Sequence, residues 1–115
     1  MIHRLLLVVA GILLAGCGEN QQTAAADPAV IARGKALFTG TCGAYCHKMT
    51  PGGGDAVFLF DCDWKHGASD ADIFKVINEG VANTLMVAFG GAFPEGDNDT
   101  NAIIAYLRDA SQCKQ

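Results

Sequence analysis

Positive charge is scarce in this sequence. Eight Lys and Arg stand against twelve Asp and Glu, the formal net charge is −4, and the chain contains no run of basic residues. Proteins that bind nucleic acid use clustered Lys and Arg to neutralise phosphates, so this composition excludes a nucleic-acid partner. The sequence also lacks an evident catalytic constellation, because no activated nucleophile and no paired acid and base stand out. This absence favours a non-enzymatic protein.

Long hydrophobic runs are absent as well. The most apolar stretch, residues 5–16, has twelve residues and is too short to span a bilayer. It follows a positively charged start at Arg4, a layout typical of a secretory signal peptide. The stretch ends in Leu14-Ala15-Gly16-Cys17 and resembles the lipobox of bacterial lipoproteins, whose signal is cut before the Cys. We therefore predict a signal peptide over residues 1–16 and a lipid on Cys17, with an ordinary signal peptide cut nearby as the alternative.

A lipid on Cys17 implies an exported, periplasmic protein that is anchored to a bacterial membrane without a transmembrane helix. Gly18, rather than Asp, follows the Cys, which by resemblance to enterobacterial sorting favours the outer membrane. Residues 17–27 show no apolar periodicity and predict a flexible tether. The folded domain is expected over residues 28–115.

The apolar spacing of this domain predicts an all-α fold. Helices are expected over residues 28–40 and 69–80 and from about residue 97 onward, because apolar residues recur there at three-and-four spacing. Gly40 and Gly80 are the expected ends of the first two helices. The residues expected to cap the three helices are Asp27, Ser69 with Asp72, and Asp97 to Asp99.

The sequence Cys42-Gly43-Ala44-Tyr45-Cys46-His47 is the chemically richest segment of the chain. Two Cys followed directly by His is the pattern for covalent haem attachment, in which the thiols add to the haem vinyl groups and the imidazole ligates the iron. The usual spacing has two residues between the thiols and this chain has three. A zinc site that also uses Cys62 and His66, or a redox dithiol, is the alternative.

Three further segments resemble class I c-type cytochromes. Gly34 and Phe38 match the first-helix pair at which the last helix crosses, and Tyr106 matches the aromatic of that last helix. Met86 lies where the family's loop presents a distal Met ligand, although Val87 replaces the usual Pro after it. The resemblance implies a small cytochrome c-like fold of three to four helices around one covalent haem c and its iron.

The resemblance leaves several ligands open. Met86 is the expected distal ligand and His66 the alternative, whereas Met49 is too close to His47 along the chain to reach the other haem face. In the family a Pro carbonyl orients the axial His; this chain lacks that Pro, so Pro51 or another backbone carbonyl takes the role. The aromatic side chains expected as the haem wall, or as plain core, are Phe58, Phe60 and Trp64.

Cys62 and Cys113 remain once lipid and haem have used three thiols. A disulfide between them would close a loop of about fifty residues and stabilise the fold by about 4 kcal/mol in the chain-entropy model. Two free thiols is the alternative, less suited to an exported protein.

The function predicted from these features is single-electron transfer between redox proteins, with a periplasmic dehydrogenase or a terminal oxidase as partner. A haem enzyme or a gas or peroxide sensor with an open distal site is the alternative, and it requires Met86 to be core filler or a weak ligand.

Overall fold

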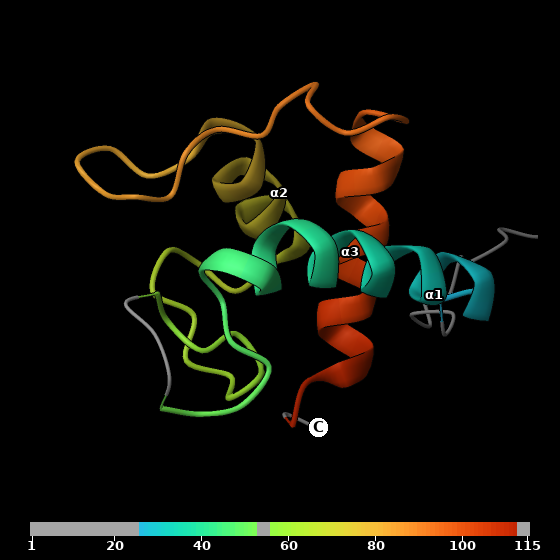
Figure 1. Ribbon diagram of the computed structural model, residues 1–115, viewed down its shortest axis with the longest axis horizontal. Coiled ribbons are helices and arrows are strands. Elements are labelled where there is room, and N and C mark those ends of the chain that lie inside the picture. The colour runs from blue at the N-terminus through green and yellow to red at the C-terminus, as the bar shows by residue number, and fades with distance from the viewer. Residues whose placement is uncertain (1–25, 53–55, 113–115) are drawn as a thin grey trace, which may run out of the picture.

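The computed structural model describes residues 26–52 and 56–112 (Figure 1). These residues form three α-helices and no strand, which confirms the predicted all-α fold. The helices are α1 (Pro28–Leu37), α2 (Asp70–Glu79) and α3 (Asp97–Ala110), and a π-helical segment, η1 (Phe38–Gly43), continues α1. Among the described residues, none of the helices has the length and apolar character needed to cross a membrane.

The first two helices begin as the sequence predicts. The Asp27 carboxylate accepts a hydrogen bond from the Ala29 backbone N–H at 2.8 Å, and Pro28 occupies the first turn of α1. At α2, the Ser69 hydroxyl accepts from the Asp72 N–H while the Asp72 carboxylate accepts from the Ser69 N–H, both at 3.1 Å. This reciprocal capping lowers the pKa of Asp72, because Ser69 stabilises its ionised form.

One predicted helix boundary and one predicted helix cap are wrong. The first helix does not end at Gly40, because the chain stays helical through η1 as far as Gly43. At α3 the N-cap is Gly96 and no side chain caps the helix. Asp99 instead accepts from the Glu95 backbone N–H at 2.9 Å and from Arg33 of α1.

The crossing of α1 and α3 organises the fold, and Figure 1 shows α1 passing across the middle of α3. Gly34 is buried at this crossing, and a Cβ at this position would lie 1.9 Å from the Ala102 carbonyl oxygen. Only glycine permits such an approach, which is the packing reason for a residue that costs a helix about 1 kcal/mol relative to Ala. The predicted close crossing at Gly34 is confirmed.

Arg33 and Asp99 tie the same two helices together beside this crossing. The guanidinium donates to both carboxylate oxygens of Asp99, with Nη2 3.0 Å from Oδ2, and Asp99 has no exposed surface. The hydrogen bond from Arg33 holds the pKa of Asp99 below its ordinary value. A buried carboxylate is tolerated here because its partners come from both α1 and the backbone before α3.

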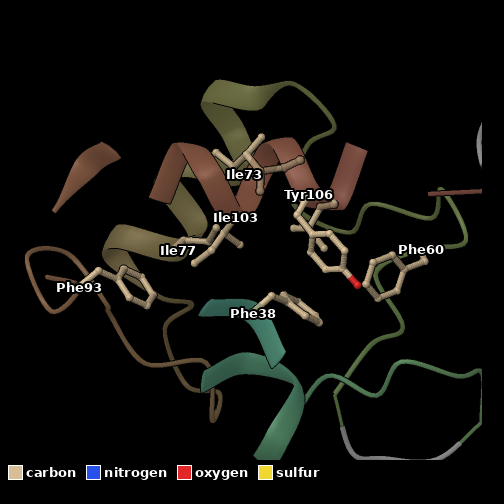
Figure 2. Close-up of a cluster of buried hydrophobic side chains, with 9 residues drawn as sticks. Phe38, Phe60, Ile73, Ile77, Phe93, Ile103 and Tyr106 are labelled. Atoms are coloured by element: carbon tan, nitrogen blue, oxygen red, sulfur yellow. The ribbon is translucent and has the colours of Figure 1, made fainter. Parts of the chain in front are cut away.

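An aromatic cluster fills the core next to the crossing (Figure 2). The Phe38 ring lies 5.5 Å from that of Phe60 and 5.7 Å from that of Tyr106, centroid to centroid. Tyr106 therefore meets Phe38 as the sequence predicts. Phe60 is 4% exposed and belongs to this core.

Candidate functional site

A cavity of about 410 Å³ lies beside the aromatic core. Its walls come from η1 and the residues that follow it, from the loops before and after α2, and from α2 and α3 themselves. Most of the side chains that line it are apolar, among them Ile73, Ile77, Ile103 and Leu107. Cofactor sites in proteins have about this size and character.

The thiols of Cys42 and Cys46 and the imidazole of His47 line this cavity together. Neither thiol is oxidised; Cys42 is half-buried and Cys46 is exposed. Burial, with a smaller effect from Cys46, raises the pKa of the Cys42 thiol to about 11. At neutral pH the Cys42 thiol is therefore protonated.

One hydrogen bond orients His47. Its Nδ1 lies 2.9 Å from the Val57 carbonyl oxygen, and since a carbonyl can only accept, Nδ1 carries the proton. Nε2 is then the unprotonated nitrogen with a lone pair available for a metal. The open question of what replaces the missing Pro is thus answered by Val57, and Pro51 makes no such contact.

Met86 lines the cavity from the loop between α2 and α3. It is half-buried, whereas its neighbours Leu85 and Val87 are 84% and 60% exposed. The loop is fixed by a hydrogen bond from the Val81 N–H to the Met86 carbonyl at 2.9 Å. Gly80 ends α2 directly against this loop: its φ of 72° favours glycine, and a Cβ there would lie 2.6 Å from the Met86 carbonyl oxygen.

His66 also lines the cavity, so both candidates for a second axial ligand are present there. Met49 does not line it. Of the three aromatic residues expected as a wall, Trp64 lines the cavity while Phe58 and Phe60 do not. Those two side chains pack with each other, their centroids 5.5 Å apart, so of the two expectations for them the plain core is the one that the structure supports.

These residues fit a covalently attached haem. The cavity is largely apolar, the thiols of Cys42 and Cys46 line it, and the His47 ring is oriented there by its hydrogen bond to the Val57 carbonyl. The zinc alternative does not fit, because the described residues contain no group of three or more His, Cys, Asp or Glu side chains that could hold a metal ion. Cys62, which that alternative needed, is disulfide-bonded.

The family comparison agrees with this fit. A family model described as cytochrome C oxidase, cbb3-type, subunit III matches residues 29–107, well over half of the chain. The chain belongs to this family. Its cytochrome c domain implies a covalent haem c and electron transfer. No curated protein and no solved structure matches the chain.

The remaining cysteines of the chain are only partly described. The Phe60 carbonyl accepts a hydrogen bond from the Gln112 N–H at 3.0 Å, which brings the chain before Cys113 close to the loop of Cys62. Cys113 and Cys17 lie outside the described residues. The pairing of Cys62 with Cys113 and the lipid on Cys17 therefore stay predictions.

Sequence reasoning missed two functional features of the cytochrome. Nothing in the sequence marks the carbonyl of Val57, because any backbone carbonyl of the loop would satisfy the same requirement. Phe38 was placed only at the helix crossing, yet it also lines the cavity. Phe38 lies four residues before Cys42, and this spacing predicts that the two side chains share one helical face.

Proposed function

We propose that this chain is a monohaem electron carrier in which Cys42 and Cys46 bind haem c and His47 and Met86 are its axial ligands. The observation that carries the proposal is the hydrogen bond from His47 Nδ1 to the Val57 carbonyl, in a cavity that both thiols and Met86 also line. That bond fixes the tautomer and the ring orientation that an axial ligand requires.

Haem attachment to the two thiols and electron transfer between redox proteins require no other oxidant or reductant. Each thiol adds across a vinyl C=C, forming an S–C bond and giving its hydrogen to the other vinyl carbon, with no net change in electron count. Haem held by Cys42, Cys46 and His47 would supply one-electron chemistry between a reduced and an oxidised redox protein.

The protein's own residues tune that iron. The Val57 carbonyl makes the His47 ring a stronger donor. Met86 supplies a thioether, which stabilises the ferrous state and raises the reduction potential. The apolar side chains of the walls would surround a bound haem with a low-dielectric environment, which also favours the less charged ferrous state.

The redox partner and the location follow from the same proposal. The family's description as an oxidase subunit favours a terminal oxidase as partner over a periplasmic dehydrogenase. The lipobox-like segment before Cys17 favours an exported, periplasmic domain anchored by lipid to a bacterial membrane, with the outer membrane favoured by Gly18.

The experiment is absorption spectroscopy of the full chain made together with a c-type haem maturation system. We expect covalent haem and, in the ferric state, the weak near-infrared band of sulfur bound to iron. Met86→Ala should abolish that band. Met49→Ala is the matched control and should keep it, because Met49 does not line the cavity.

Each result that contradicts the proposal points to a different cause. If Met86→Ala keeps the band, Met86 is not the ligand. If the band is absent from the wild type and His66→Ala changes the ferric spectrum, His66 is the ligand. If the wild type binds exogenous cyanide or carbon monoxide readily, its distal site is open, as in an enzyme or a sensor. Absence of covalent haem would overturn the proposal as a whole.

A further inference from the structure

The chain around the attachment motif departs from a regular α-helix. After Leu37 the helix widens into the π-helical η1 (Phe38–Gly43), in which backbone bonds span five residues instead of four. The widening continues into the motif, where the Cys42 carbonyl accepts from the His47 N–H at 2.9 Å and from the Cys46 N–H at 3.1 Å. The five-residue bond to His47 is thus the shorter of the two.

This bond compensates for the unusual spacing. With two residues between the thiols, the His would follow the first Cys by four positions, and in an α-helix its N–H would bond to that Cys carbonyl. Here His47 follows Cys42 by five positions, and the wider turn restores the same backbone bond. A π-bulge accommodates one additional residue in a helix, which is the number by which this motif exceeds the usual one.

The contacts of the three intervening residues identify the surplus one. A Cβ on Gly43 would lie 3.4 Å from the Phe38 ring, so this position packs against the core. Tyr45 lines the cavity. Ala44 is exposed and does not line the cavity, so its removal deletes no wall of the site.

We infer that residues 42–47 are a two-residue-spaced haem attachment site into which Ala44 is inserted, and that the π-turn keeps the first thiol and the axial His in register. This inference rests on the proposed function. With Ala44 as an insertion, the two thiols would reach the two vinyl groups as they do in the usual motif. The site should then tolerate loss of Ala44.

The experiment deletes Ala44 from the full chain, made together with a c-type haem maturation system. The deletion variant should retain one haem per chain through both thiols, shown by intact-protein mass and by loss of both thiols to alkylation under denaturing conditions. An insertion of one Ala after Ala44 is the matched control. It should lose at least one of the two attachments, because no ordinary helical turn then returns the His N–H to the Cys42 carbonyl.

A second measurement needs no variant. In the reduced, haem-loaded wild type, NMR coupling across hydrogen bonds should connect the His47 amide nitrogen to the Cys42 carbonyl carbon. Coupling to the Gly43 carbonyl instead would overturn the inference, as would loss of attachment in the Ala44 deletion. Absence of covalent haem from the wild type is a different result, since it overturns the proposed function itself.

Discussion

The crossing of α1 and α3 and the cavity beside it differ in how their apolar surface is covered. At the crossing, protein covers protein: Gly34 lies against the Ala102 carbonyl, and Ile103 is 1% exposed. At the cavity, Tyr45 and Leu85 line the wall and yet are 81% and 84% exposed. Apolar side chains left in water are unfavourable, so the cavity side calls for a partner that the crossing does not need.

The difference shows that the chain buries the helix crossing with its own side chains but does not fully cover the walls of the cavity. The crossing is closed by helix packing, by the aromatic cluster around Phe38 and by the Arg33–Asp99 pair. The cavity is bordered by two loops that contain no helix among their described residues, and their hydrogen bonds include those to the carbonyls of Val57 and Met86. A bound cofactor would cover the walls of the second half and stabilise it through binding.

The largest loss of stability is expected when a side chain is added at Gly34, where α1 and α3 come into contact. Gly34→Ala places a methyl group within 1.9 Å of the Ala102 carbonyl oxygen, so the helices must separate. We expect the free energy of unfolding of the haem-loaded protein to fall by about 3 kcal/mol, measured by denaturant titration.

Gly40→Ala is the matched control for this change. Gly40 is also helical, but a Cβ there would meet nothing within 4 Å. Its free energy of unfolding should stay unchanged or rise by up to about 1 kcal/mol, the usual helical preference for Ala over Gly. Equal losses in the two variants would show that the close approach at Gly34 is not what holds the crossing.

A smaller, pH-dependent effect is expected at the Arg33–Asp99 pair. The pKa of Asp99 is lowered in the fold by Arg33, so its ionised form stabilises the fold. This contribution is complete above the ordinary value of 3.8 and is lost as the pH falls through the lowered folded value. Asp99→Asn should therefore lower the denaturant concentration at the midpoint of unfolding at pH 7. The difference between the midpoints of the variant and the wild type should shrink on acidification below about pH 4.

Asp63→Asn is the control for that titration. Asp63 also pairs with a cation, Lys65, but both side chains are more than half exposed. Exposed pairs contribute little, so the variant should follow the wild type at every pH. A difference between wild type and Asp99→Asn that does not depend on pH would refute the role assigned to the Asp99 charge.

The smallest effect is expected at the mouth of the cavity. Leu85→Ala should change the free energy of unfolding by less than about 0.5 kcal/mol, because Leu85 is 84% exposed. Leu107→Ala, on the same cavity but 2% exposed, should cost about 3 kcal/mol. Both costs are measured in the protein without haem, where similar values would mean that Leu85 is buried without a cofactor, which would remove the contrast between the two halves.

The predictions that succeeded from sequence depend on local chemistry. Asp27 and Ser69 cap helices because the hydrogen bonds of a helix end involve residues within three positions of the cap. The three-and-four spacing that predicted the helix over residues 69–80 also places Ile73 and Ile77 together on its buried face. The same locality misled at Asp97 to Asp99, where the sequence resembles a cap but Asp99 is used by the distant Arg33.

The three helices and the grouping of two thiols with an imidazole follow from the sequence alone, because each depends on residues a few positions apart. Contacts between distant parts of the chain make the Val57 carbonyl orient His47 and place Phe60 in the core and not in the cavity wall. The structure also shows that the helix does not stop at Gly40 but widens into η1, which ends at Gly43 within the attachment motif. These outcomes depend on which backbone groups and rings meet across long stretches of chain, and residue type alone does not determine such meetings.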